Sequence, residues 1–372
     1  MPGAGGPRRQ ATLATLAASL KVSRTTVSNA YNRPDQLSPA LRERVLREAA
    51  RLGYPGPDPV ARSLRTRKAG AVGLLLTEAL SYAFRDPAAV SFLAGLSEAC
   101  EAAGQGLLLV PAHPGRDRTE ASQAVLSAGV DGFVVYSVAE DDPYLAAVLR
   151  RGVPTVICDQ PDGLDGVDRV GIDDRAAVRE LAEHLITLGH RHFGVLCMRL
   201  GRDRNDGPAS TERWRGARFH VQRERLEGLS DALSAAGLDL SEMPVVERFD
   251  HLVEQGQSAA AEALDADPGI TALVCTTDVL ALGALREARR RGLDVPGQLT
   301  VTGFDGVPQA LAEGLTTVLQ PVEEKGRAAG RLLLEPREAG VAATPRTVLL
   351  PTTLELGRTS SSPQQPKWFS GL

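Results

Sequence analysis

This sequence of 372 residues lacks most of the features that mark an exported protein, a membrane protein or a common enzyme. No apolar run reaches the roughly 18 residues that a membrane span needs. The first ten residues, MPGAGGPRRQ, contain no apolar stretch like that of a secretory signal, and we expect them to be disordered. The patterns GxxxxGK[ST], GxSxG and HExxH are absent, as is a GxGxxG after a predicted strand. These absences argue against export, membrane insertion and the enzyme classes that use those motifs.

Cysteine and histidine are scarce and scattered. The four cysteines form no CxxC pair, and three of them lie in or at the end of apolar, strand-like runs: Cys158, Cys197 and Cys275. We therefore expect buried thiols in a reducing cytoplasm, not disulfides or zinc ligands. The six histidines show no metal-ligand spacing on one helix face. The sequence predicts neither a metal nor a cofactor.

Charge is distributed unevenly along the chain. Residues 1–70 hold thirteen Lys and Arg but only four Asp and Glu, a net formal charge of +9. The remaining residues hold 29 basic and 42 acidic side chains, a net charge of −13. A basic N-terminal part attracts phosphates, whereas the acidic remainder repels them. The asymmetry indicates nucleic-acid binding near the N-terminus, and the alternative is an ordinary solvated basic helix surface.

Residues 11–32 have the pattern of two short helices joined by a tight turn at Lys21-Val22-Ser23. A third helix follows and stops at Gly53. The candidate N-caps of the three helices are Thr12, Ser23 and Ser38, the last followed by a proline that suits a first helical position. In the second helix, polar side chains stand opposite apolar ones and can bond base edges. The segment therefore predicts a helix-turn-helix that binds specific DNA sequences.

From residue 71 onward, strand-like apolar runs alternate with amphipathic helices. The candidate strands are 71–77, 106–110, 131–137, 154–159, 192–197, 271–276 and 299–304, and the candidate helices include 87–103, 175–188, 225–235 and 279–291. This alternation predicts an α/β body with parallel sheets covered on both faces. About 290 residues exceed what one such sheet holds, so we expect two lobes. Ligands bind beyond the carboxyl ends of such strands, which are therefore the candidate site.

The sequence resembles the LacI–GalR family of bacterial transcription regulators over roughly residues 11–361. The resemblance rests on several stretches in the right order: TLATLAASLKVSRTTVSNAYN, LSPALRERVLREAARLGYPGPDPVARSLRTRKAGAVGLLL, GVDGFVVYS, GVPTVICD, GIDDRAAVRELAEHLITLGHRHFGVL, TTDVLALGALREARRRGLDVPGQLTVTGFDG and LLPTTLELGRTS. It implies an all-α helix-turn-helix headpiece and a two-lobed body like that of periplasmic binding proteins.

The resemblance also divides the chain into parts. It implies a headpiece at 11–56, a hinge helix and linker at 57–70, an effector-binding and dimerisation body at 71–356, and a flexible tail at 357–372. Within the body we expect the first lobe at about 71–160 and 319–340, and the second at about 161–318 and 341–356. The tail contains no leucine heptad, so the resemblance favours a homodimer over a coiled-coil tetramer.

For DNA, the resemblance implies that the second helix enters the major groove. Arg24, Thr25 and Asn29 are the candidate base-reading residues, because Arg can pair with guanine and Asn with adenine. Further DNA-contact candidates are Ser23, Thr26, Ser28 and Asn32, and for the first three the alternative is helix capping or phosphate contact. In the hinge segment DPVARSLRTRK, Leu64 and its twin from a second subunit would wedge into the minor groove. The alternative for Leu64 is packing in a linker helix.

For the effector, the resemblance singles out Asp159, Arg225 and Asp305. Two carboxylates and a guanidinium suit a polyol, so a sugar is the default ligand. The alternative for each aspartate is helix capping. Two further candidates are Thr277, which stands where the family often carries Asn, and Phe84, whose ring could stack on a ligand or act as a lid or in packing. Trp214 could also stack on a ligand, or belong to a surface loop.

We therefore expect a homodimeric transcription regulator of the bacterial cytoplasm, a repressor associated with the nucleoid while bound to a near-palindromic operator. A small ligand would control its affinity for double-stranded DNA. We expect no membrane partner. One alternative is a sugar-binding transport protein without a DNA-regulatory role, which predicts a signal sequence and no basic headpiece. Another is an enzyme in which Asp159 and Asp305 form an acid/base pair, although nothing in the sequence sets their separation.

Overall fold

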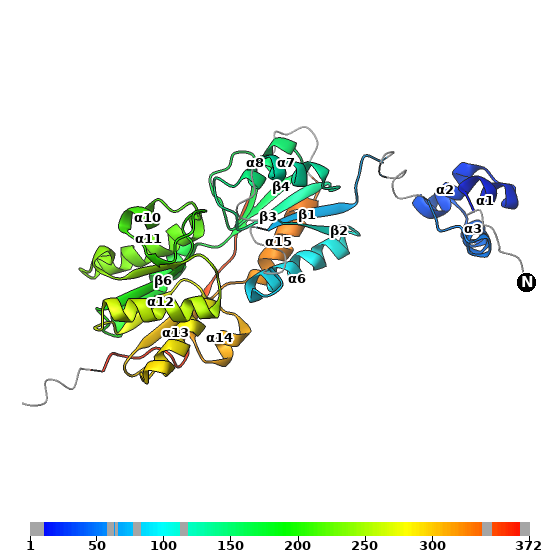
Figure 1. The fold of residues 1–372 in the computed structure, drawn as a ribbon. Coiled ribbons are helices and arrows are strands. Elements are labelled where there is room, and N and C mark those ends of the chain that lie inside the picture. The colour runs from blue at the N-terminus through cyan, green and yellow to red at the C-terminus, as the bar shows by residue number, and fades with distance from the viewer. Residues whose placement is uncertain are drawn as a thin grey trace, which may run out of the picture. The chain divides into compact units, whose positions relative to one another are not determined.

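The structure is a computed structural model that describes residues 11–57, 63, 66–76, 83–111, 118–336 and 344–364. The chain forms two compact units, one up to Ala69 and one from Gly70 onward (Figure 1). Most of the predicted hinge segment, including Leu64, lies outside the described residues. Among the described residues, no helix combines the length and the apolarity that a membrane crossing requires.

The first unit is a three-helix cluster, as the sequence predicted. It consists of α1 (Leu13–Leu20), α2 (Arg24–Asn32), a short 3-10 turn η1 (Pro34–Gln36) and α3 (Pro39–Leu52). All three predicted N-caps are confirmed, since the hydroxyls of Thr12, Ser23 and Ser38 accept backbone N–H groups of the following turn. Lys21 turns the chain between α1 and α2 with a φ of 54°. The apolar faces of the helices form a small core of Leu16, Ala17, Leu20, Val27, Ala30, Val45 and Ala49.

The first lobe of the second unit is built on a six-stranded parallel sheet in the order β12-β5-β4-β3-β1-β2. The strands are β1 (Ala71–Leu76), β2 (Gly106–Pro111), β3 (Gly132–Tyr136), β4 (Thr155–Cys158), β5 (Asp168–Gly171) and β12 (Thr347–Leu349). Helices α6 (Pro87–Ala102) and α15 (Val322–Leu334) pack together on one face, and α7 (Arg118–Ser127) and α8 (Pro143–Arg151) cover the other (Figure 1).

The second lobe is built on a seven-stranded sheet in the order β13-β11-β10-β9-β6-β8-β7. Its strands are β6 (Phe193–Met198), β7 (Gly207–Pro208), β8 (Val245–Arg248), β9 (Ala272–Cys275), β10 (Thr300–Asp305), β11 (Thr316–Leu319) and β13 (Thr353–Glu355), of which β7 and β13 are antiparallel edges. Helices α9 (Asp174–Thr187) and α11 (His220–Ala235) cover one face, and α12 (Val253–Ala266) and α13 (Asp278–Arg291) cover the other. The short α10 (Thr211–Arg215), η2 (Leu240–Glu242) and α14 (Pro308–Ala312) complete this lobe.

The chain passes between the two sheets three times: after β5, after β11 and after β12. The predicted lobe boundaries are therefore wrong in two places, because β5 and β12 belong to the first sheet, not the second. Both strands are short, and β5 carries the charged pair Asp168-Arg169, so neither stands out as an apolar run. Pairing with β4, which brings Val156 opposite Asp168, places β5 in the first sheet.

The predicted flexible tail is wrong for residues 357–364. Thr359 is buried, and its hydroxyl donates to the Val301 carbonyl at 2.7 Å and accepts from the Thr316 amide at 2.9 Å. A ring nitrogen of His190 lies 2.9 Å from the Ser361 carbonyl oxygen. The small hydroxyl side chains that made this segment look unstructured satisfy backbone groups at the edge of the second lobe instead.

Two further expectations concern side chains of the core. All four cysteines are buried free thiols, as predicted. Trp214 was predicted either to stack on a ligand or to lie in a surface loop, and both alternatives are wrong. It is 2% exposed and packs in the core between the sheet of the second lobe and its covering helices.

Candidate effector cleft and DNA-reading helix

Helix α2 has one buried face and one exposed polar face. Val27 and Ala30 are buried, whereas Arg24 and Thr25 are exposed. Arg24 begins the helix, where a recognition helix contacts base edges. The two predicted base-reading residues with the greatest exposure are thus free of the core and available to a second molecule.

The other DNA-contact candidates on α2 hold the helix itself together. The Ser23 hydroxyl caps the helix through the Thr26 amide at 3.0 Å. The side-chain amide of Asn32 donates to the carbonyl of Ser28 at 3.0 Å and to its hydroxyl at 3.2 Å. The amide of Asn29 donates to the Gln36 side chain at 3.1 Å, so η1 orients it. Capping therefore accounts for Ser23, and a contact of these side chains with DNA stays a prediction.

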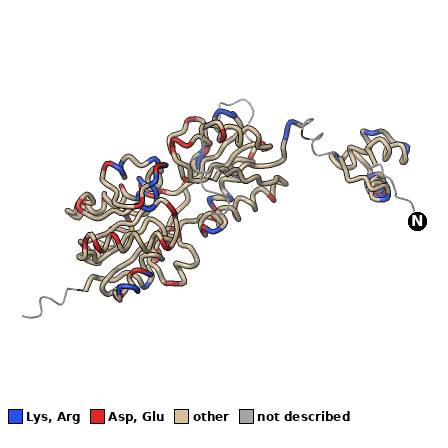
Figure 2. Tube along the Cα trace, in the orientation of Figure 1, with Lys and Arg blue, Asp and Glu red and all other residues tan. Residues whose placement is uncertain are grey.

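The first unit presents mainly positive charge (Figure 2). Part of its negative charge is neutralised internally, because Glu48 accepts two hydrogen bonds from Arg51 at 2.7 Å and one from Ser19. The hydrogen bonds from Arg51 and Ser19 lower the pKa of Glu48 to about 2. This ion pair cancels one charge of each sign, so the unit keeps the net positive charge that attraction to a phosphate backbone requires.

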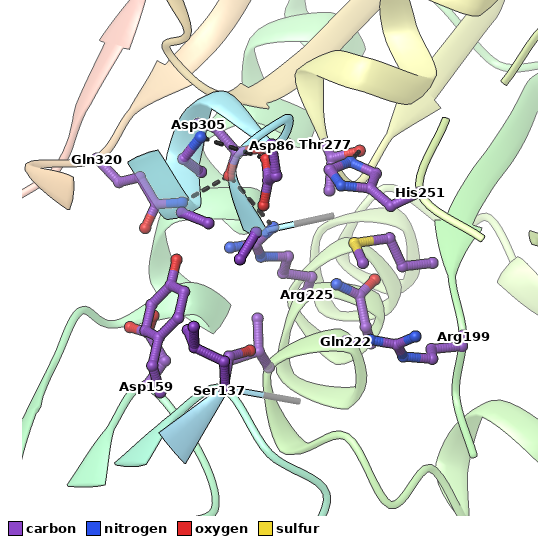
Figure 3. Close-up of a pocket in the computed structure, with 17 residues that line it drawn as sticks. Asp86, Ser137, Asp159, Arg199, Gln222, Arg225, His251, Thr277, Asp305 and Gln320 are labelled. Carbon is purple, nitrogen blue, oxygen red and sulfur yellow. Dashed lines mark hydrogen bonds and ion pairs between the residues drawn. The ribbon is translucent and has the colours of Figure 1, made fainter. Parts of the chain in front are cut away.

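A polar cavity lies in the second unit where the carboxyl ends of strands from both sheets meet. From the first lobe it is lined by residues after β1, β3 and β4 and at the start of α6, and from the second by residues after β6, β9 and β10 and along α11. Figure 3 shows Asp159 and Ser137 on one side, Thr277 and His251 across from them, and Arg225 between. This is the position in which an open parallel sheet binds its ligand, here provided by two sheets at once.

Four of the five predicted effector residues line this cavity: Asp159, Arg225, Thr277 and Asp305. The fifth, Phe84, is 61% exposed and is not among the residues that line it. Its neighbour Asp86 does line the cavity and caps α6 by accepting the Ala88 amide at 3.2 Å. The structure therefore brings together three predicted residues at strand ends and Arg225 of α11, and leaves Phe84 outside.

Three residues at strand ends have backbone conformations that favour glycine. The φ angles are 54° for Ser137, 66° for Asp159 and 125° for Asp305, and all three residues line the cavity. A positive φ in a residue other than glycine carries a strain of order 1–3 kcal/mol and is concentrated at functional sites. The strain here turns three polar side chains toward a shared space.

Arg225 is buried and held firmly in the wall of the cavity. Its Nε donates to Asp174 Oδ1 at 2.8 Å, and one terminal nitrogen donates to the Thr276 carbonyl at 2.5 Å. Its guanidinium lies 3.6 Å from the ring centroid of Phe304, and a terminal nitrogen lies 3.9 Å from Asp305 Oδ1. These contacts fix the guanidinium in place, as a preorganised ligand-binding group requires.

Asp305 shares its environment with a second carboxyl, that of Asp278. Asp278 accepts from the Thr317 hydroxyl at 2.6 Å and from the Val307 amide at 2.8 Å, which fastens the loop that follows β10. Burial raises the pKa of Asp305 well above its usual value, an effect that the charge of Arg225 opposes and that of Asp278 reinforces. A raised pKa favours the protonated form, which both donates and accepts hydrogen bonds.

Thr277 acts partly as a structural group. Its hydroxyl caps α13 by accepting the Leu280 amide at 3.3 Å, and a ring nitrogen of His251 lies 2.8 Å from it. Burial lowers the pKa of His251, so the neutral imidazole is favoured. Helix capping was the alternative considered for Asp159 and Asp305, but the residue that caps a helix here is Thr277.

Several cavity residues were not predicted as effector contacts, among them Gln222, His251 and Gln320. Gln222 precedes Arg225 by three residues on α11, and this helical spacing could have revealed it. Its Oε1 is buried and has no hydrogen-bond partner in the described part of the chain. His251 and Gln320 follow β8 and β11, which the sequence did not reveal as strands. The described residues contain no group of three side chains suited to a metal ion.

A helix-turn-helix unit followed by a two-lobed body with a polar cleft defines a DNA-binding regulator with a ligand-binding domain. Residues 182–360 match the family model of a periplasmic binding protein-like domain. An HTH-type transcriptional regulator of Mycolicibacterium smegmatis is 60% identical over 368 residues, which cover 98% of this chain and all of the relative.

Solved structures agree with this assignment. A LacI-family transcriptional regulator from Corynebacterium glutamicum is 42% identical, with a TM-score of 0.73 over 93% of this chain and 98% of that one. The transcriptional regulator CelR in complex with cellobiose is 30% identical, with a TM-score of 0.67 over 94% of this chain and 99% of that one. The chain belongs to the LacI family of transcriptional regulators.

Proposed function

We propose that this protein is a homodimeric repressor that binds a near-palindromic operator and is controlled by a neutral sugar or related polyol in the cleft. Two α2 helices related by a two-fold axis would read the two half-sites. Exposed Arg24 and Thr25, together with Asn29, supply the base contacts. Leu64, outside the described residues, would be the minor-groove wedge. Such a repressor acts in the bacterial cytoplasm, at the nucleoid.

The observation that carries the ligand proposal is the balance of charge around the cleft. The guanidinium of Arg225 is paired with Asp174, and the buried ammonium of Lys325 is paired with Asp159 at 2.6 Å. These two cations are already neutralised by the protein's own carboxylates. A third buried cation that lines the cavity, Arg199, lies over the rings of Phe219 and Phe249, and the lining carboxyls of Asp86 and Asp305 offset its charge. What remains suits hydroxyl groups, namely carboxyl oxygens that accept and amide or guanidinium groups that donate. The cellobiose complex of CelR, which is 30% identical, agrees with a neutral sugar.

Control of the operator follows from the position of the cleft between two sheets. A ligand that contacts Asp159 of the first lobe and Arg225 of the second binds most tightly to one relative arrangement of the lobes. A change in that arrangement would alter the spacing of the two hinge segments in a dimer. Coupling of this kind is typically about 1–3 kcal/mol, or roughly 5–150-fold in affinity.

Selection of bound sites from a random double-stranded DNA pool tests the DNA-binding part of the proposal. The purified full chain is expected to enrich a near-palindromic sequence. Repeating the selection with D-ribose, D-glucose, cellobiose, D-mannitol and myo-inositol tests the ligand part, since an active polyol changes the yield of bound DNA. Enrichment of a single, non-repeated half-site would contradict the homodimer, and no enrichment in any pool would contradict operator binding.

A further inference from the structure

Lys325 is a buried cation in a place where the fold does not need one. It lies on α15, is 1% exposed, and is flanked on the same helix by the buried apolar residues Val322, Ala329 and Leu332. This face of α15 packs against α6 and the first sheet. An apolar side chain of similar length would fill the same space without the cost of burying a charge. The lysine therefore calls for an explanation beyond packing.

The ammonium group of Lys325 is hydrogen-bonded to two residues that line the cleft, although Lys325 itself does not line it. Nζ donates to Asp159 Oδ1 at 2.6 Å and also to the side-chain oxygen of Gln320. Asp159 and Gln320 both line the cavity. Lys325 thus acts from behind the wall of the site, and any effect of it on a ligand passes through these two partners.

Gln320 continues the connection into the second lobe. Its amide nitrogen donates to Asp305 Oδ1 at 2.5 Å, and its backbone amide donates to the Asp305 carbonyl at 3.4 Å. It stands between β11, which belongs to the second sheet, and α15, which packs on the first. A continuous chain of hydrogen bonds therefore runs from Asp159 through Lys325 and Gln320 to Asp305, along one of the three crossings.

The charge of Lys325 is maintained by its surroundings. Burial lowers the pKa of Lys325, but the negative charge of Asp159, with smaller contributions from Cys158 and Asp174, outweighs burial and leaves the pKa raised. The ammonium form therefore persists at neutral pH. A protonated lysine can only donate hydrogen bonds, and both of its partners here are oxygen atoms that accept them.

We infer that Lys325 is a positioning residue of the effector response, which fixes Asp159 and, through Gln320, Asp305 at the spacing that a polyol bridges between the lobes. This inference rests on the proposed function of the cleft. It assigns a role to a residue that does not touch the effector. The hydrogen-bonded link fixes the distance between the carboxyl of Asp159, at the end of β4, and that of Asp305, at the end of β10.

The test compares Lys325→Met with Arg331→Met, a matched substitution on the same helix at an exposed side chain. Binding of the full chain to its selected operator is followed by fluorescence anisotropy, with each of the five polyols named above. For a polyol that shifts operator binding by wild type, Lys325→Met is expected to raise the half-effective concentration about tenfold or more, the size of a lost hydrogen bond to a charged group. Arg331→Met is expected to respond as wild type does.

A second comparison separates positioning from general destabilisation. In the Asp159→Asn background, adding Lys325→Met is expected to cause a further loss of response well below tenfold, because only the hydrogen bond from Lys325 to Gln320 is left to lose. This pair of variants also carries the test if Lys325→Met alone does not fold, since the double variant buries no unpaired cation. A further loss of tenfold or more in the double variant, or an unchanged half-effective concentration in Lys325→Met, would overturn the inference while leaving the proposed function intact. If no polyol shifts wild type, the proposed function fails, and the inference fails with it.

Discussion

Arg225 Nε donates to Asp174 Oδ1 at 2.8 Å, and both side chains are buried beside the effector cleft. Removing one member of a buried pair leaves the other charge uncompensated. We therefore expect Arg225→Met to lower the free energy of unfolding by about 3–5 kcal/mol. Urea unfolding followed by circular dichroism measures this, and the double variant Arg225→Met/Asp174→Asn should recover part of the loss. A single variant as stable as wild type would show that the pair contributes nothing to the fold.

The pH dependence of stability is expected to reflect buried neutral histidines. Burial lowers the pKa of His251 below its usual value of 6.5, so the folded protein resists a proton that the unfolded chain accepts. The stability that this neutral histidine contributes is complete above about pH 6.5 and is lost as the pH falls through the folded-state pKa.

His190 and His220 have pKa values lowered by burial as well, so they add to the same loss. Thermal unfolding between pH 7.5 and 5 should show the decline in wild type, and His251→Asn should make it shallower. An equally steep decline in the variant would exclude His251 as a source. Three charged groups act on the pKa of His251: Asp86 favours its protonation, whereas Arg199 and Arg225 oppose it.

Arg24 is expected to read a base and not merely to neutralise a phosphate. Arg24→Ala should weaken binding to the selected operator by about 1–3 kcal/mol. Arg24→Lys keeps the charge but loses the planar fork that pairs with guanine, so it should lose operator affinity while retaining affinity for unrelated DNA. Electrophoretic mobility shifts with both DNAs at one salt concentration provide the measurement. If Arg24→Lys binds the operator as tightly as wild type does, Arg24 contacts a phosphate and does not read a base.

The segment 357–364 is expected to stabilise the second lobe. Thr359→Val removes a hydroxyl that serves the Val301 carbonyl and the Thr316 amide, and leaving those buried groups unsatisfied should cost about 1–3 kcal/mol of stability. Thr353→Val, at an exposed position of β13, is the matched control and should stay within about 0.5 kcal/mol. If the two variants melt alike in differential scanning calorimetry, the segment is dispensable for the fold.

The long apolar strands were predictable because most of them, such as β1 and β3, are buried on both faces and read as uninterrupted runs. All seven predicted strands are present in the structure. The short strands were not predictable from the sequence: β8 (VVER) ends in two charged residues whose side chains are nevertheless buried. Glu247 there accepts from Arg213 and from the Leu200 amide, partners that are distant in sequence and known only from the fold.

The same limit applies to the cleft. Asp159, Thr277 and Asp305 could be predicted because they directly follow strands that the sequence reveals. Lys325 could not, since the run EEKGR looks like the exposed face of a charged helix. Its burial depends on β4 and α6, which approach it only in the folded protein. Long-range pairing of this kind leaves no periodic trace in a single sequence.

Ligand control of operator binding through the cleft is tested most directly at Gln222, a buried cavity residue with no partner for its Oε1 among the described residues. Operator dissociation constants of wild type and Gln222→Leu are measured by fluorescence anisotropy, with and without the polyol that shifts wild type. We predict a shift of roughly 5–150-fold in wild type and a much smaller one in Gln222→Leu. An equal shift in both proteins would place the effector elsewhere, and no shift of wild type by any polyol would contradict ligand control by this class of molecule.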